Sequence, residues 1–314
     1  MKIKMLCTIL VVCLCFSFIG CDKKDKSSSE TNLVFKEPKI VSTMTQEEKD
    51  SIKVGKLSKE HEYYNEVVTL DPECANYINE ISIFDKEVND TFVVHVSLPP
   101  SYDKSKKYPL VLMTDGVWRL SDHPQLRAAM KNNEFEEVIL VSVGYPNGYD
   151  YRTIRERDLV NKPADFLHFM CDNLMPYLVE QYSVDTMNMT LAGHSYAGYW
   201  ATYSLFHDEI SKNMFRNYFI ASPSVQASTD NVDLATLRDE FYKKNKTLNV
   251  NIYACVGDRE EEGFKYMIGQ FMDDTKALKF KGLNMKYEVI ADNDHNTVFK
   301  PAIKNALKMF YSKK

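Results

Sequence analysis

The sequence has no surplus of basic residues. Its 314 residues carry 39 Lys and Arg against 44 Asp and Glu, which gives a formal net charge of −5 at pH 7. Proteins that bind nucleic acid present clustered Lys and Arg to the phosphates, and no basic stripe is found along this chain. The composition therefore argues against nucleic acid as a partner. The chain also has no internal repeat.

Closely spaced cysteines are also absent. Of the seven cysteines, only Cys74, Cys171 and Cys255 lie beyond residue 60, and they are far apart in the sequence. An odd number without close spacing fits neither a disulfide framework nor a zinc motif. We expect buried free thiols, with one disulfide pair left open, and no metal or other cofactor.

An apolar run of the length usual for a membrane-spanning helix is missing as well. Lys2 and Lys4 precede an apolar stretch, residues 5–19, that resembles a signal peptide. The stretch ends in Phe18-Ile19-Gly20-Cys21, which resembles a bacterial lipobox, although Phe18 stands where leucine is usual. Cleavage before Cys21 would leave a lipidated residue; a plain secretory signal or a short membrane anchor are the alternatives.

The charged segment that follows predicts a spacer. Residues 22–60 are rich in Lys, Ser, Glu and Asp and have little to bury, which is typical of a flexible tether. We therefore divide the chain into a signal peptide (1–20), a lipidated cysteine and tether (21–60) and one domain (61–314). This organisation predicts a lipid-anchored protein of the bacterial cell envelope, at the outer membrane and facing the periplasm or the surface.

The domain alternates strand-like and helix-like segments. Such alternation predicts an α/β fold with a mostly parallel sheet and helices on both faces, and ligands bind beyond the carboxyl ends of such strands. Strands are expected over residues 90–98, 108–113, 137–143, 187–192, 218–222, 249–256 and 285–291, and helices over 164–181, 199–207, 263–279 and 300–311.

The most informative segment is 191–198, Leu-Ala-Gly-His-Ser-Tyr-Ala-Gly, between a predicted strand and a predicted helix. This pattern indicates a nucleophile elbow, a sharp turn that exposes the hydroxyl of Ser195 above the sheet. The alternative is an ordinary turn with a capping serine.

A serine nucleophile needs a base, and the base needs a carboxylate. His295 follows the last predicted strand and is the expected base. The loop after residue 256 offers Asp258, Glu260, Glu261 and Glu262, of which at most one is expected to be catalytic. Asp292 and Asp294 lie very close to His295 in sequence but are not excluded as the acid.

Further residues are assigned to the same site. Tyr196 and the loop at Gly116 and Val117 are expected to supply backbone N–H donors for an oxyanion, although Gly116 also suits a simple turn. Trp118 could form a wall of a site for an aromatic substrate, or simply pack. Arg157, from a charged cluster with Arg152, Arg155 and Asp158, could clamp an anionic or polar substrate or remain solvated. We expect the side chain of His194 to point away.

Several ordered motifs resemble one family of α/β-hydrolases. They are Tyr-Pro-Leu-Val-Leu at 108–112 with Asp115-Gly116, Val-Gly-Tyr-Pro at 143–146 with Arg-Glu-Arg-Asp-Leu at 155–159, Pro176-Tyr177 followed by the helix to Tyr182, and Ser-Pro-Ser at 222–224. The family is the esterase family that includes enterochelin (siderophore), feruloyl and acetylxylan esterases, S-formylglutathione hydrolase and the mycolyltransferases.

The resemblance implies an α/β-hydrolase fold and a triad of Ser195, His295 and Glu260, with Asp258 in reserve. Two departures stand out: Ala197 occupies a position where the family usually has glycine, and Val225-Gln226-Ala227 replaces aromatic residues after Ser-Pro-Ser. The implied activity is hydrolysis of small-molecule or oligosaccharide esters, either feruloyl and acetyl polysaccharide esters or siderophore esters. The alternatives are a non-catalytic ligand-binding lipoprotein, an acyltransferase or a thioesterase. The oligomeric state is left open.

Overall fold

The computed structural model describes residues 35–313, which belong to one compact unit, Leu33–Lys314. The predicted signal peptide and Cys21 lie outside the described residues. Within the described part, no helix combines the length and the apolar character needed to cross a membrane.

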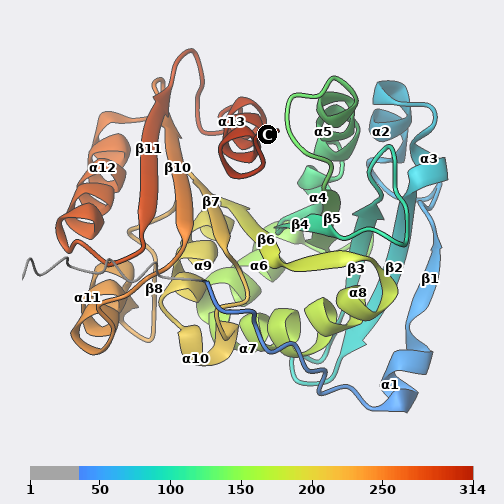
Figure 1. Cartoon of the computed structure of the whole chain (residues 1–314), viewed down its shortest axis with the longest axis horizontal. Coiled ribbons are helices and arrows are strands. Elements are labelled where there is room, and N and C mark those ends of the chain that lie inside the picture. Colours follow the sequence, from blue (N-terminus) through green and yellow to red (C-terminus); the bar gives the residue numbers. More distant parts are fainter. Residues whose placement is uncertain (1–34, 314) are drawn as a thin grey trace, which may run out of the picture. The chain divides into compact units, whose positions relative to one another are not determined.

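One large sheet organises residues 35–313 (Figure 1). Its order is β1-β2-β3-β5-β4-β6-β7-β10-β11, with the first three strands antiparallel and the six from β5 to β11 parallel. The predicted mostly parallel α/β sheet, the α/β-hydrolase fold class, is therefore confirmed. The strands are β1 (Lys53–Lys56), β2 (Ile78–Asp85), β3 (Asp90–Ser97), β4 (Tyr108–Met113), β5 (Ile139–Gly144), β6 (Val184–His194), β7 (Asn217–Ala221), β10 (Asn251–Gly257) and β11 (Asn284–Ile290), while β8 (Ser228–Thr229) and β9 (Val232–Asp233) form a separate hairpin.

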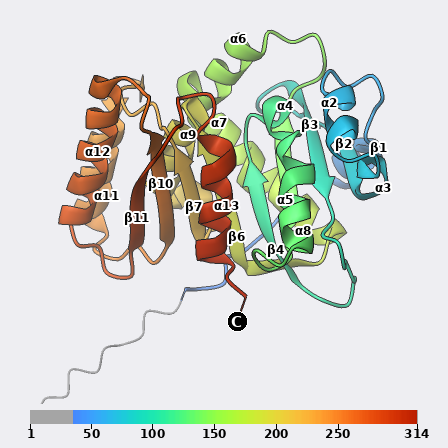
Figure 2. The same ribbon diagram turned by 90° about the horizontal axis from the view of Figure 1, so that it is seen from above.

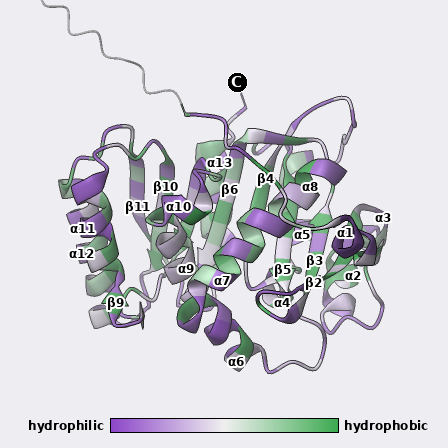
Figure 3. Ribbon diagram, turned by 90° about the horizontal axis from the view of Figure 1, so that it is seen from below, coloured by the Kyte–Doolittle hydropathy of each residue, from purple (hydrophilic) through white to green (hydrophobic). Residues whose placement is uncertain are grey.

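Helices cover both faces of the sheet. Figures 1 and 2 show α5 and α13 together on one face, where they enclose one apolar cluster, and the other face carries α7, α9 and neighbouring helices. Burial of the central strands on both sides explains their continuous apolar runs; Figure 3 shows hydrophobic colour on β4 and β6. The helices are α1 (Gln46–Ser51), α2 (Tyr64–Leu70), α3 (Cys74–Tyr77), α4 (Gly116–Arg119), α5 (Asp122–Lys131), α6 (Tyr151–Glu156), α7 (Pro163–His168), α8 (Met175–Gln181), α9 (Tyr196–Leu205), α10 (Asp208–Ser211), α11 (Leu234–Lys244), α12 (Glu262–Ala277) and α13 (Phe299–Phe310), with the π-helical segments η1 (Arg157–Asn161) and η2 (Phe169–Leu174).

The single helix expected over residues 164–181 is interrupted by η2. Pro176 has no N–H to donate to the carbonyl four residues earlier, that of Asp172, so the regular hydrogen-bond ladder cannot continue there. The Asp172 carbonyl instead accepts from the N–H of Thr43, at 3.0 Å.

The hydrogen bond between Thr43 and Asp172 also fixes part of the segment that was expected to be a tether. The predicted tether of residues 21–60 does not reach residue 60, because its described part contains helix α1 and strand β1, and β1 pairs with β2. Thr45 caps α1 in a capping box, and Lys49 forms an ion pair with Glu180 of α8 at 2.6 Å. Local capping and contacts with distant elements therefore order a segment whose composition alone indicated a spacer.

The cysteine prediction holds for the described residues. Cys74, Cys171 and Cys255 are all free and buried. Burial raises the pKa of each thiol above its ordinary value, so these side chains behave as small apolar groups of the core.

Candidate active site

Ser195 lies in a sharp turn between β6 and α9. Its φ of 60° and ψ of −119° form a conformation that is rare for a residue with a side chain. The turn is held by neighbouring backbone: the Ser195 N–H donates to the Ala221 carbonyl at 3.0 Å, and the Ser195 carbonyl accepts from the N–H of Ser224 at 3.1 Å. The strand-turn-helix geometry expected of a nucleophile elbow is present.

The closest packing in this turn is at glycine, not at position 197. A Cβ added to Gly193 would lie 2.0 Å from the carbonyl oxygen of Ala197, and one added to Gly198 would lie 3.0 Å from that of Ala221. Ala197 itself is fully buried in the larger apolar cluster. The departure from the family pattern at Ala197 is therefore accommodated by core packing, while Gly193 and Gly198 supply the space.

The imidazole of His295 is paired with Glu260. Nδ1 of His295 lies 2.7 Å from Oε2 of Glu260, and the other carboxylate oxygen accepts from the Ser222 hydroxyl at 2.5 Å and from the Gly257 N–H at 2.8 Å. Burial alone would raise the pKa of Glu260, but hydrogen bonds from His295, Ser222 and Gly257 outweigh it and lower the pKa below its ordinary value. Because an ionised carboxylate only accepts, Nδ1 carries the proton and Nε2 is left as the basic nitrogen.

The other candidate carboxylates have different roles. Asp258 accepts from the N–H of Asn293 at 3.1 Å, and Asp294 accepts from backbone N–H groups of its own turn. Asp292 forms an exposed ion pair with Arg259, and Glu261 precedes α12 at the surface. Glu260 is thus the carboxylate that the structure brings to His295.

Gly257 allows the two loops to meet. A Cβ at this position would lie 2.2 Å from the carbonyl oxygen of Asn293. The same loops are joined by hydrogen bonds from Asp258 N–H to the Ile290 carbonyl and from Arg259 N–H to the Asn293 carbonyl, both at 3.0 Å. The loop after β10 and the loop that carries His295 therefore form one unit beside Ser195.

Two cavities share Ser195 and His295. One, of about 380 Å³, is also lined by Asp115, Trp118, Arg119, Arg155, His194 and Asn296. The other, of about 500 Å³, is also lined by Tyr196, Ser224, Gln226, Arg259, Glu260, Glu261 and Phe264. A serine and a histidine on the boundary between two cavities leave room for the two halves of a substrate that is cleaved between them.

The predicted oxyanion donors lie at helix starts. Tyr196 is the first residue of α9, and Gly116 and Val117 are the first two residues of α4, so these three N–H groups have no acceptor within their own helices. Gly116 also packs tightly against β5, since an added Cβ would lie 2.5 Å from the Val143 carbonyl carbon. Gly116 therefore packs closely against β5 and begins α4, while its role as an oxyanion donor stays a prediction.

Arg155, rather than Arg157, lines the cavity at Ser195. Its guanidinium makes a two-point ion pair with the buried Asp115, at 2.7 and 2.6 Å. It lies over two rings, those of Trp118 and Tyr196, with 5.5 and 5.2 Å to their centroids. Trp118 therefore lines the cavity as predicted and also packs against Arg155.

The structure does not bring Arg157 to this site. Its guanidinium binds Asp158 at 2.7 Å and Asp90 at 2.6 Å, and it lines neither cavity at Ser195. Asp158 is buried and also accepts from the hydroxyl of Tyr145 at 2.9 Å. Arg157 therefore belongs to an ion-pair network that joins η1 to β3. The structure does not place it where it could clamp a substrate at Ser195, contrary to the expectation.

His194 does not point away as expected. Its ring centroid is 4.6 Å from that of His295, and it lines the smaller of the two cavities. Burial and the nearby Arg119 hold the pKa of His194 well below its ordinary value. His194 is therefore neutral beside His295.

Sequence reasoning did not assign Ser222, Ser224 or Phe264 a part in this site. Ser222 binds Glu260, Oγ of Ser224 lies 3.5 Å from Oγ of Ser195, and the ring of Phe264 meets that of His295 edge-on at 5.4 Å. The Ser-Pro-Ser turn was a visible signal because it follows a predicted strand. No comparable signal marked Phe264.

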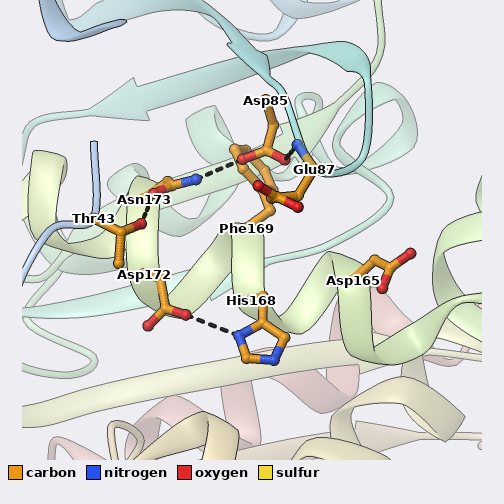
Figure 4. Close-up of a pocket in the computed structure, with 8 residues that line it drawn as sticks. All are labelled: Thr43, Asp85, Glu87, Asp165, His168, Phe169, Asp172 and Asn173. Atoms are coloured by element: carbon orange, nitrogen blue, oxygen red, sulfur yellow. Dashed lines mark hydrogen bonds and ion pairs between the residues drawn. The ribbon is translucent and has the colours of Figure 1, made fainter. Parts of the chain in front are cut away.

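A separate cavity of about 280 Å³ lies near the N-terminal segment (Figure 4). Asn173 joins Thr43 to Asp85 there, and His168 pairs with Asp172. It shares no lining residue with the cavities at Ser195. Over residues 35–313, no group of three or more His, Cys, Asp or Glu side chains is placed to hold a metal ion.

Known proteins resemble this chain both in sequence and in fold. The family model described as "Putative esterase" matches residues 86–309. Ferri-bacillibactin esterase BesA of Bacillus subtilis is 21% identical over 250 residues, which cover 70% of this chain and 84% of BesA. Siderophore hydrolase EstA from Aspergillus nidulans has a TM-score of 0.63 at 20% identity, over 76% of this chain and 95% of EstA. A feruloyl esterase module from Clostridium thermocellum has a TM-score of 0.57 at 17% identity, over 89% and 97% of the two chains.

Proposed function

The chain belongs to this esterase family and is a carboxylic ester hydrolase, and we propose that it works through a triad of Ser195, His295 and Glu260. The observation that carries the proposal is the Glu260–His295 hydrogen bond of 2.7 Å, formed beside a serine in an elbow conformation. Ionised Glu260 fixes the imidazole with Nδ1 protonated, which directs the basic Nε2 toward the shared cavities.

The proposed reaction has two steps. Nε2 of His295 takes the proton of the Ser195 hydroxyl as Oγ attacks the ester carbonyl carbon, and the proton then passes to the leaving alcohol. Water, deprotonated by the same nitrogen, then attacks the acyl carbon. The bond to Oγ of Ser195 breaks, Oγ takes the proton back from Nε2, and the acid is released. The Ser195 hydroxyl lies 3.5 Å from that of Ser224, so the mechanism requires it to turn toward Nε2 when substrate binds. The N–H groups of Tyr196, Gly116 and Val117 are proposed to stabilise the oxyanion.

Two substrate classes are proposed from the relatives. BesA is named a ferri-bacillibactin esterase, EstA is named a siderophore hydrolase, and another neighbour is a feruloyl esterase module. We therefore propose siderophore esters or feruloyl and acetyl esters of polysaccharides as substrates. The lipobox-like segment at Cys21 supports a lipid-anchored location in the bacterial envelope, where both classes are accessible.

The first experiment measures hydrolysis of a chromogenic short-chain acyl ester by the purified domain, with Ser195→Ala as the matched control. The proposal requires activity that this substitution abolishes; equal rates for both proteins would refute it. An acyltransferase or thioesterase would share the triad. Adding competing acceptor alcohols separates transfer from hydrolysis, because a transferase yields a new ester and a hydrolase yields the free acid.

A further inference from the structure

A third cavity adjoins the larger cavity at Ser195. It has a volume of about 260 Å³, lies between α11 and α12, and shares Gln226 with the cavity at the serine. Helix α12 lines both: Phe264 faces the catalytic histidine, and Tyr266, Met267, Gln270 and Phe271 line the third cavity. Figures 1 and 2 show α11 and α12 side by side at the β11 end of the sheet. A substrate that reaches past Gln226 would therefore enter this cavity, here named the α11–α12 subsite.

Large apolar side chains are exposed at this subsite. Tyr266 is 71% exposed and Met267 is 40% exposed, although both are residues that usually bury much of their surface. Tyr has an apolar ring face and a hydroxyl, and the combination suits a ligand with both apolar and hydroxylated surfaces. These side chains form a platform on the path that leads away from Ser195.

The polar groups around the platform define the chemistry of its ligand. Gln270 donates to Asp274 at 2.9 Å, and Asp233 accepts from the N–H of Thr236 at 2.7 Å with one of its two oxygens. The buried Arg238 is paired with Asp239 at 2.8 Å, so its charge is already balanced. Two carboxylates and two amides, those of Gln226 and Gln270, are acceptors and donors for hydroxyl groups, and the carboxylates repel anions.

We propose that the α11–α12 subsite binds a neutral sugar ring of the substrate, located beyond the sugar or acyl group at the scissile ester. The face of a sugar ring presents C–H groups to the Tyr266 ring, and its hydroxyls meet Asp233, Asp274 and the amides. The iron complex of a tris-catecholate siderophore is anionic and is disfavoured by the same carboxylates. The inference rests on the proposed ester hydrolase activity and selects the oligosaccharide ester among its substrate classes.

The test compares kcat/KM for a chromogenic acetyl ester, an acetylated monosaccharide and an acetylated xylo-oligosaccharide. The acetyl group is too small to reach the subsite, so only the sugar chain can. We expect wild type to prefer the oligosaccharide, and Tyr266→Ala to lower kcat/KM for that substrate alone by about three- to tenfold, the effect of one lost ring contact. Tyr266→Phe keeps the ring and should retain most of the preference.

Phe84→Ala is the matched control, because Phe84 is another exposed aromatic, 52% exposed on β2, and lines none of these cavities. It should change no kcat/KM. The inference is overturned if wild type shows no preference for the longer ester or if Tyr266→Ala leaves that preference intact. It is also overturned if Tyr266→Ala impairs hydrolysis of a siderophore trilactone instead. Failure of the esterase proposal is distinguishable, because wild type would then match Ser195→Ala on the chromogenic ester.

Discussion

The backbone of Gly257 packs directly against the carbonyl group of Asn293, two residues before His295 in the chain. A Cβ at Gly257 would lie 2.2 Å from that carbonyl oxygen, closer than atoms can approach. Gly257→Ala must therefore displace the loop that carries His295, and a 1 Å displacement costs roughly 10²-fold in rate. We expect kcat to fall by about that factor. The measurement is kcat on a short ester, with circular dichroism to show that the variant is folded.

The second prediction concerns Glu260. Glu260→Gln keeps the size of the side chain but removes the charge that fixes the tautomer of His295, and a comparable amide substitution costs about 10⁴ in kcat. We expect a loss of about 10²- to 10⁴-fold, with KM changed much less. Steady-state kinetics on one chromogenic ester measures it.

Asp258→Asn and Glu261→Gln are the matched controls for that substitution. Each removes one carboxylate from the same loop, but neither side chain binds His295 in the structure. Both variants should retain kcat within a few fold. A loss in Glu261→Gln as large as that in Glu260→Gln would contradict the assignment of the acid.

The third prediction tests the departure at position 197. Ala197 is fully buried in α9, so Ala197→Gly removes a buried methyl group and adds backbone freedom within a helix. We expect a loss of about 1–2 kcal/mol in the free energy of unfolding, with little change in kcat. Urea unfolding and short-ester kinetics on the same preparation measure the two. A large rise in kcat would show instead that alanine strains the elbow.

The sequence predicted the parallel centre of the sheet better than its edges. The apolar runs of β5, β6 and β10 are long because those strands are buried on both faces, and the elbow follows from the glycines around Ser195. Strand β1, Lys53–Lys56, is fully exposed along its length and has no alternating pattern, so only its pairing with β2 reveals it. The Thr45–Glu48 capping box is a local signal, but the contacts with β2 and α8 that also order this segment are made by residues distant in the sequence.

The site residues likewise divide into those that the sequence could predict and those that it could not. His295 and the acidic loop could be found from their order after Ser195, because strands that end at one edge bring their following loops together. The sequence could not show which of Arg155 and Arg157 lines the cavity at Ser195. The directions of two side chains separated by one residue are set only when the helix that carries them has formed. The contact of Phe264 with His295 depends on how α12 packs, which no local pattern specifies.

The fourth prediction follows from the ion pairs of Arg157. Arg157→Gln removes the partner of Asp158, which is only 1% exposed, and of Asp90. Leaving a buried carboxylate with fewer partners costs about 1–3 kcal/mol. We expect a lower unfolding midpoint and an unchanged KM. A KM raised severalfold with stability unchanged would instead restore Arg157 as a substrate residue.

The fifth prediction concerns stability in acid. His123 is fully buried between the hydroxyls of Ser97 and Ser142, and His61 is buried beside His95 and Glu80. Burial lowers the pKa of His123 to about 3 and that of His61, where His95 adds repulsion, to about 4, from an ordinary value of 6.5. The unfolded chain therefore binds more protons below pH 6.5, and the free energy of unfolding must fall as the pH decreases.

The measurement is urea unfolding between pH of about 6.5 and 4.5 in wild type and in His61→Gln, because the carboxylates that begin to titrate at the lower end are the same in both proteins. We expect wild type to lose more than ~2 kcal/mol across it, since each lowered pKa unit corresponds to about 1.4 kcal/mol. His61→Gln cannot be protonated and should flatten the slope, whatever its stability at neutral pH. An identical slope in wild type and His61→Gln would show that His61 remains accessible to protons in the folded protein.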